Sequence, residues 1–221
     1  MGMDEPIASI GVGARYPGDG DTPEHFYGFL LAGRPACPKT TIRHGHFLKG
    51  SMAAFDAPFF SITPKEASGM DPQQRGMLEC VYAAPENAGI CLENAAGTHT
   101  GIYVGCQDLK YAATGSVASM LSNRISWFYN LRGPSLNIDT ACSSSLVAMH
   151  QACNSPELGG VLGLDGVCQG FNKKGNRYGR GQGFSVVVLE RVSDCIRDGD
   201  TIRAVIRNPG SNQNGRSPGI T

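Results

Sequence analysis

The sequence predicts an α/β fold with a mixed sheet, because strand-like and helix-like segments alternate along its 221 residues. Hydrophobic residues make up 41% of the chain, which is enough for a buried core. Thirty glycines indicate many tight turns between the elements. No internal repeat or low-complexity block interrupts the pattern. We therefore expect one globular unit over residues 1–221.

Composition and charge exclude several classes of function. The 19 basic and 19 acidic residues cancel, and no basic stripe indicates a nucleic-acid partner. No apolar run approaches the roughly 20 residues that span a bilayer, and the acidic N-terminus lacks a signal-peptide core. We expect a cytoplasmic protein with reduced cysteines. The eight cysteines include no C-x-x-C pair, and His44 and His46 lack a partner pair, so no metal site is expected.

The first expected elements are a strand and a short helix. Pro6–Val12 has the apolar positions of a strand. The following Gly11-Val-Gly13 resembles a dinucleotide fingerprint, but Tyr16 occupies the third glycine position, so nucleotide binding is disfavoured. Thr22–Leu31 predicts an amphipathic helix, with Thr22 as N-cap and proline at the first helical position.

A longer helix is expected to begin at Asp71. The Asp71 side chain can cap it, and Gln74 completes a capping box. The aromatic segment Phe55–Phe60 before it should pack on the core. Pro85 falls inside the helical pattern, where it removes one backbone hydrogen bond, so the helix should kink or end near Ala84.

The remaining pattern adds strands and helices in alternation. Gly101–Gly105 reads as a short buried strand, and residues 111–128 are helical in pattern. Phe184–Leu189 is apolar throughout and should be buried on both faces. Asp194–Asp198 predicts a short helix and Ile202–Ile206 a last strand.

Ser135–Cys153 joins a strand pattern, Ser135–Asp139, to a helical one, and Cys142 falls at the junction. The helical pattern comes from Leu146, Val147, His150 and Cys153. A thiol in the first turn of a helix faces unpaired N–H groups and the positive end of the dipole, which favour the thiolate. Two interpretations stay open at this point: a nucleophilic cysteine, or a small cysteine buried under the helix.

The segment Asp139-Thr-Ala-Cys142-Ser-Ser-Ser145 resembles the active-site motif of β-ketoacyl synthases, in the form that polyketide synthases use. Further segments resemble the same family in the same order: residues 5–11, 15–18, 55–60, 70–75, 124–126, 131–135 and 212–216. The amino-acid sequence of these segments is most similar to that of the iterative reducing polyketide synthases of filamentous fungi. The chain is identified as the N-terminal half of such a ketosynthase domain.

This resemblance implies a thiolase-like fold, layered α/β/α/β/α and built from two similar halves. Residues 1–221 would form the N-terminal half only, with internal shortenings. Cys142 is the one position that carries over as catalytic. It would accept an acyl chain from the phosphopantetheine arm of an acyl carrier protein, for decarboxylative condensation with malonyl carrier protein. The resemblance further implies an acyltransferase of polyketide or fatty acid biosynthesis and of secondary metabolism, a possible homodimer, and no directly bound cofactor.

Departures from the family pattern suggest an alternative. The family's two catalytic histidines lie in His-Gly-Thr-Gly-Thr and Asn-Ile-Gly-His motifs, and neither occurs in this sequence. Asn154–Leu162 stands in place of a longer family segment, and Gln182 and Asn214 replace acidic residues. The alternative is a catalytically inactive remnant or an incomplete gene product.

A hydrolase that pairs Cys142 with His150 is a third hypothesis. His150 lies eight residues beyond the cysteine in the sequence. On one helix that separation is about 12 Å, too far for a nucleophile–base hydrogen bond of about 3 Å.

Overall fold

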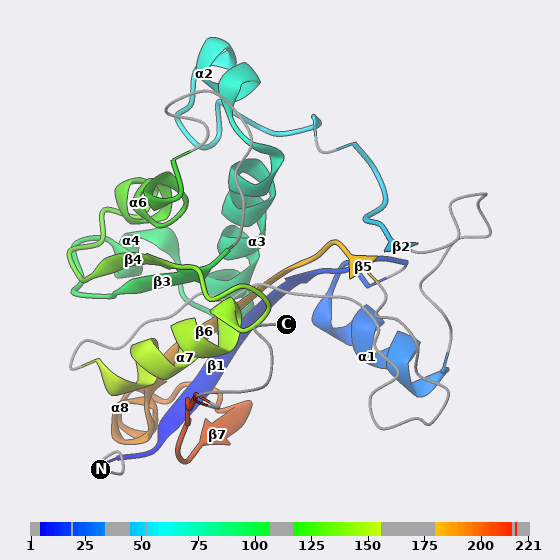
Figure 1. Cartoon of the computed structure of the whole chain (residues 1–221). Helices are drawn as coiled ribbons and strands as arrows, with labels where there is room; N and C mark the ends of the chain where they lie inside the picture. The colour runs from blue at the N-terminus through cyan, green and yellow to red at the C-terminus, as the bar shows by residue number, and fades with distance from the viewer. Residues whose placement is uncertain are drawn as a thin grey trace.

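The computed structural model describes residues 5–18, 20–33, 45–51, 53–106, 117–155, 180–213 and 215. Helices and strands alternate along these residues, as expected of an α/β fold (Figure 1). The elements are β1 (Ile7–Arg15), α1 (Pro23–Leu31), β2 (Gly45–His46), α2 (Pro64–Gly69), α3 (Pro72–Ala88), α4 (Leu92–Ala95), β3 (Ile102–Gly105), α6 (Ser119–Phe128), β4 (Ser135–Ile138), α7 (Ser144–Asn154), β5 (Arg180–Gly181), β6 (Phe184–Arg191), α8 (Val192–Asp198) and β7 (Ala204–Ile206).

The strands pair both in parallel and in antiparallel, as the expected mixed sheet requires. β1 lies between β6 and β7 and is antiparallel to both. β3 and β4 are parallel neighbours, and the short strands β2 and β5 form a second parallel pair. α3 packs against β1 and β6, while α7 packs against β3 and β4. The β3–β4 pair lies beside α7, close to β6 and β1 (Figure 1).

Two buried clusters place helices on both faces of the strands. The larger cluster joins α3 and α6 to β3 and β6 through side chains such as Val81, Ile125 and Val186. The smaller cluster joins α7 to β1, β3 and β6, and Tyr103 and Ala148 belong to it. Neighbouring residues of one strand point to opposite faces, so these clusters form an α/β/α arrangement.

Glycines bring α3 unusually close to β1. Gly11 and Gly13 lie inside β1 rather than in a loop. A Cβ on Gly11 would lie 2.4 Å from the carbonyl oxygen of Ala84, and one on Gly13 would lie 2.4 Å from that of Cys80. Both glycines therefore have a packing role. The strand also runs on to Arg15, beyond the expected end at Val12, because this glycine segment continues its pairing with β6.

Of the two outcomes expected from Pro85, a kink or an end near Ala84, the end is wrong. α3 continues to Ala88, and Gly89 closes it with a φ of 80°. Pro85 has no N–H for the carbonyl of Val81, four residues earlier. The hydroxyl of Tyr129, the C-cap residue of α6, donates to that carbonyl at 3.5 Å. A side chain from another helix thus supplies the donor that proline removes.

Other local predictions hold with small shifts. Thr22 caps α1 by accepting from the His25 N–H at 3.2 Å, and Asp71 caps α3 by accepting from the Gln73 N–H at 2.8 Å. Phe60 is buried in the larger cluster. The helical pattern of residues 111–128 is described only from residue 117, and α6 starts at Ser119.

Candidate active site

The turn between β4 and α7 presents Cys142 to solvent. β4 ends at Ile138 and α7 begins at Ser144, with Ser143 as its N-cap residue. Cys142 therefore lies one residue before the cap, at the N-terminal end of the helix but not in its first turn as expected. The thiol is exposed. Because it is exposed, the alternative of a small cysteine buried under the helix does not fit this geometry.

The backbone of this turn is strained just before the cysteine. Ala141 has a φ of 55°, a left-handed conformation that non-glycine residues seldom adopt. The Asp139 carboxylate accepts a hydrogen bond from the Ala141 N–H at 2.9 Å. Strain of this kind persists only where the surroundings hold it, and it is common at functional sites.

Ser144 holds the other side of the turn. Its Oγ accepts from the Thr140 N–H at 2.8 Å and donates to the Ala141 carbonyl at 2.6 Å. The side chain belongs to a residue that is only 2% exposed. One buried hydroxyl thus joins the residues before and after Cys142. The sequence shows a run of three serines but does not indicate which of them makes these bonds.

Small residues let α7 approach the strand beneath it. A Cβ on Gly105, at the end of β3, would lie 2.5 Å from the Ser145 nitrogen. Ala148 and Ala152 are fully buried on the sheet side of the helix. Of the positions whose spacing predicted this helix, Cys153 is buried with these alanines, whereas Leu146 is 68% exposed. Leucine is too large for a helix that packs this closely.

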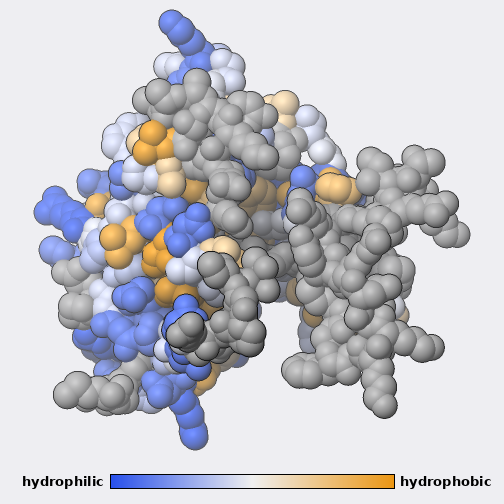
Figure 2. Space-filling view, viewed as in Figure 1, coloured by the Kyte–Doolittle hydropathy of each residue, from blue (hydrophilic) through white to orange (hydrophobic). Residues whose placement is uncertain are grey.

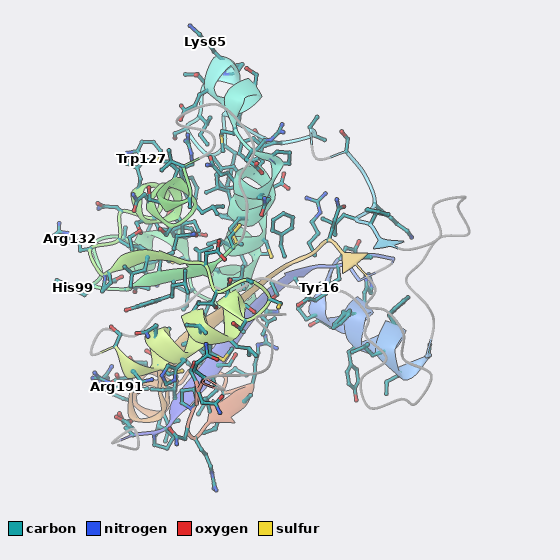
Figure 3. The ribbon with its side chains drawn as sticks, viewed as in Figure 1. Tyr16, Lys65, His99, Trp127, Arg132 and Arg191 are labelled. Atoms are coloured by element: carbon teal, nitrogen blue, oxygen red, sulfur yellow. The ribbon has the colours of Figure 1, made fainter. Side chains whose placement is uncertain are left out.

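No described histidine pairs with Cys142. His150 lies on α7, where its Nδ1 is 3.2 Å from the Asn154 side-chain nitrogen. His99 precedes β3 at the start of the parallel pair (Figure 3), whereas the Cys142 turn leaves the other end of that pair. His25 is on α1 and pairs with Asp21. The pair His44 and His46 lies outside the described side chains.

Cys142 is exposed, whereas most of the other described cysteines are less exposed or buried. Burial raises the pKa of Cys80 and of Cys195 to about 12, and it also raises the pKa of Cys153. These thiols stay protonated near neutral pH and are poor nucleophiles. Among the described cysteines only Cys91 and Cys142 are exposed.

The model of the Beta-ketoacyl synthase, N-terminal domain, matches residues 4–161, which is more than half of the chain. The chain belongs to the β-ketoacyl synthase family. It is 42% identical to a reducing polyketide synthase of Gibberella moniliformis over 275 residues, which cover 97% of this chain and 11% of that protein. A highly reducing polyketide synthase of Emericella nidulans is 40% identical, covering 98% of this chain and again 11% of the relative. The chain thus spans about a tenth of these polyketide synthases.

Solved ketosynthases share the fold. The ketosynthase from module 6 of the bacillaene synthase of Bacillus subtilis 168 matches with a TM-score of 0.86 and 30% identity, over 98% of this chain and 46% of that one. The oxazolomycin ketosynthase domain of Streptomyces albus JA3453 matches with a TM-score of 0.79 and 29% identity, over 92% and 45%. The expectation of a thiolase-like fold represented by one half is therefore confirmed.

The comparison also supports the expected shortenings of this ketosynthase. The Gibberella match spans 275 residues, whereas 97% of 221 residues is about 214. About 60 positions of the matched stretch therefore have no counterpart in this chain.

Two further features concern membranes and metals. No helix among the described residues is long and apolar enough to cross a membrane.

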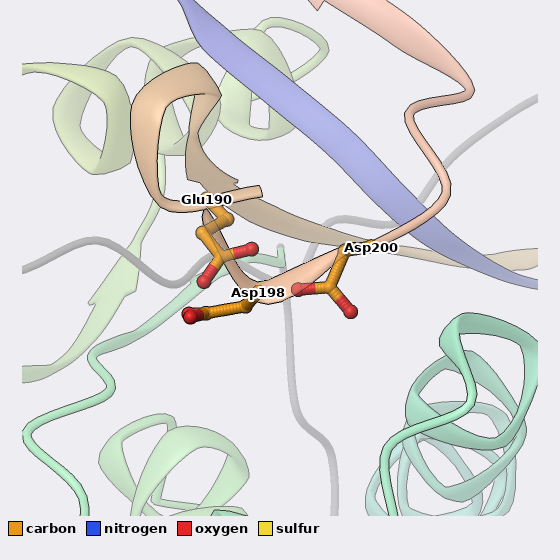
Figure 4. A group of neighbouring side chains, drawn as sticks. All are labelled: Glu190, Asp198 and Asp200. Carbon is orange, nitrogen blue, oxygen red and sulfur yellow. The ribbon is translucent and has the colours of Figure 1, made fainter. Parts of the chain in front are cut away.

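The described part of the chain holds one group of side chains with metal-ligand atoms close together (Figure 4): Glu190, Asp198 and Asp200, whose ligand atoms lie within 4.8 Å of one another. They lie at the end of β6 and around the end of α8, outside the turn that carries Cys142.

Proposed function

We propose that Cys142 is the acyl-accepting nucleophile of this ketosynthase domain, and that residues 1–221 belong to one N-terminal domain. The observation that carries the proposal is the exposed thiol just before the N-terminus of α7. Hydrogen bonds of Ser144 and Asp139 hold the turn on which it lies. Membership of the family supports it, because ketosynthase chemistry begins with a thioester on a cysteine.

The proposed donor is an acyl thioester on the phosphopantetheine arm of an acyl carrier protein. The Cys142 thiolate attacks the thioester carbonyl carbon, and a new C–S bond forms. The bond to the phosphopantetheine sulfur then breaks, and that sulfur leaves with the electron pair and takes a proton. The attacking sulfur lies beside the positive end of the α7 dipole.

The full condensation needs groups beyond those identified in this sequence. A carbanion from decarboxylated malonyl carrier protein would attack the Cys142 thioester and release a chain two carbons longer. The two histidine motifs that would generate and stabilise this carbanion do not occur in the sequence. We therefore assign acyl loading to the residues of this sequence.

The pathway, partner and cellular location are proposed by analogy with the related polyketide synthases. We propose a role in polyketide or fatty acid biosynthesis, including secondary metabolites, with an acyl carrier protein as partner and a cytoplasmic location. Homodimer formation is part of the proposal, and phosphopantetheine enters only as the carrier of the substrate.

A second candidate is a ketosynthase copy that has lost catalysis. It is favoured by one observation: His150, the histidine on α7, interacts with Asn154 rather than with Cys142. Such a copy would keep the turn without loading acyl groups.

Acyl loading distinguishes the two candidates. The purified chain would be incubated with an acyl-carrier-protein thioester, and its peptides analysed by mass spectrometry. We expect the acyl mass on the Cys142 peptide, its persistence in Cys91→Ala, and its loss in Cys142→Ala. Cys91 is the matched control because it is exposed as well. No adduct on Cys142, or equal labelling of Cys91, would contradict acyl loading and favour the inactive copy.

A further inference from the structure

A cavity of about 550 Å³ lies at the C-terminal end of α3, and its volume is in the range of small-molecule sites. The last turn of α3 and the segment that leads into α4 form one side of it, through apolar residues that include Pro85, Ile90 and Leu92. None of the lining residues belongs to the turn that carries Cys142. The cavity is therefore separate from the candidate active site.

Aromatic side chains from three separate segments line this cavity: Phe59, Tyr82 and Tyr129. The rings of Phe59 and Tyr82 meet edge to face, with centroids 4.9 Å apart and planes at 86° to each other. Two rings at nearly a right angle form a corner. Phe59 is 45% exposed, so part of its ring remains accessible outside the core. The face of an aromatic ring carries partial negative charge and attracts cations.

The charge around the cavity is negative. The charged residues that line it are Glu86 and Glu93. Both are exposed, and among the described residues neither carboxylate takes part in an ion pair. The last turn of α3 contains no basic residue, so no side chain of that turn offsets the negative end of the helix dipole. A positively charged ligand would relieve this excess of negative charge.

A bare metal ion is not the cation that these residues favour. In the described part of the chain, the side chains close enough to share a metal ion are Glu190, Asp198 and Asp200, and none of them lines this cavity. Aromatic and aliphatic walls instead favour a cation that carries an apolar body.

We propose that this cavity binds a small organic cation, an alkylammonium ion with its charge against the rings of Phe59 and Tyr82 and close to Glu86 and Glu93. Its alkyl groups contact the apolar residues at the end of α3. A quaternary ammonium ion suits this combination, because aromatic faces attract its charge while its methyl groups need no hydrogen-bond partner. The inference does not depend on the proposed chemistry of Cys142.

Choline and its neutral isostere 3,3-dimethyl-1-butanol test the proposal on the whole chain, with binding measured by isothermal titration calorimetry. We expect saturable binding of choline, and binding about ten-fold weaker for the isostere, in which carbon replaces the charged nitrogen. Choline should also slow the alkylation of Cys91 by iodoacetamide, because this exposed thiol lines the cavity. The alkylation rate of Cys142 should not change.

Protein variants locate the binding. Glu86→Gln combined with Glu93→Gln should weaken choline binding about ten-fold, because the cavity loses both carboxylates. Glu24→Gln is the control, since Glu24 is an exposed glutamate of α1 outside the cavity. Tyr82→Leu should weaken binding as well, whereas Tyr82→Phe keeps the ring and should bind choline like the parent.

Three results would overturn the proposal. Equal binding of the neutral isostere would indicate an apolar pocket rather than a cation site. Absence of choline binding, or an unchanged alkylation rate of Cys91 at saturating choline, would exclude the site. Tighter binding of N-acetyl-lysine methylamide than of choline would indicate a lysine of a partner protein instead of a small molecule.

Discussion

Ala141 adopts a backbone conformation that normally suits glycine, one residue before the proposed nucleophile. The hydrogen bonds of Ser144 and Asp139 hold this conformation from both sides. We infer that they aim the Cys142 thiol as well as stabilise the fold. Ser144 is then a positioning residue, because it acts through the turn and not on the substrate.

Ser144→Ala should reduce both stability and the reactivity of Cys142. Loss of the hydroxyl removes the partner of the Thr140 N–H, and we expect a loss of about 1–2 kcal/mol in the free energy of unfolding. Urea unfolding gives the stability, and the iodoacetamide alkylation rate of Cys142 relative to Cys91 gives the reactivity. We expect this rate ratio to fall.

Two further variants separate positioning from general destabilisation. Ser144→Thr keeps the hydroxyl and should restore the rate ratio. Ser143→Ala removes an exposed hydroxyl that donates to Thr140 at 2.9 Å, and should cost less than about 1 kcal/mol. An unchanged rate ratio in Ser144→Ala would argue against positioning.

Glu190 predicts a pH dependence of stability. Its pKa is raised above the ordinary 4.5, chiefly by burial, so its ionisation is less favourable in the folded chain than in the unfolded one. This group therefore destabilises the fold as pH rises from 4.5 through the raised pKa. Glu190→Gln should be more stable than the parent at pH 7, and the difference should shrink toward pH 4.5.

Denaturant unfolding at several pH values measures this difference. Asp198 provides the contrast, because its hydrogen bond with Arg197 lowers its pKa below 3.8. Its stabilisation is lost only as pH falls below that value, outside the Glu190 range. A Glu190→Gln advantage that did not grow with pH would contradict the prediction.

At the scale of elements, α3 shows how tertiary contacts override a local rule. Pro85 alone predicts an interrupted helix, yet α3 continues for another three residues to Ala88. Tyr129, at the C-cap of α6, donates a hydrogen bond to the Val81 carbonyl. Burial raises the pKa of Tyr129, which keeps its hydroxyl protonated as a donor.

A double-mutant cycle tests this coupling between α3 and α6. Tyr129→Phe should cost about 0.5–1.5 kcal/mol, because it leaves the Val81 carbonyl without a donor. In a Pro85→Ala background the same change should cost less, since the new backbone N–H can bond to that carbonyl. Urea unfolding of the four proteins gives the coupling energy, and equal costs in both backgrounds would exclude it.

At the scale of the whole molecule, the exposed side of α7 stands out. Leu146 on α7 is 68% exposed and Leu136 on β4 is 45% exposed. Hydrophobic side chains reach the surface over α7 and the β3–β4 pair, among hydrophilic ones (Figure 2).

Leu146→Glu should therefore reduce self-association of the purified chain. Exposed apolar patches favour association, and a charge in the patch opposes it. Analytical ultracentrifugation should show a shift from larger species toward the monomer. Leu31→Glu is the control, since Leu31 is 71% exposed but lies on α1. The prediction fails if both variants sediment like the parent.

Much of the secondary structure follows from local signals. The caps at Thr22 and Asp71 mark the starts of α1 and α3, and Phe184–Leu189 lies within β6. The junction of strand and helix at Cys142 was also predictable from the switch in hydrophobic period. These signals succeed because they depend on residues close in the sequence.

The sequence by itself determined the family, the α/β alternation and the cysteine at the strand–helix junction, because specific motifs and local periodicity encode them. Only the tertiary structure decided the rest. It showed that Ser144 closes the turn around Cys142, that the Tyr129 hydroxyl supplies the donor that Pro85 lacks, and that residues of β3 and β6 line one cavity. Each of these features depends on the geometry of the folded chain, and the last two join segments far apart in the sequence, which local patterns do not encode.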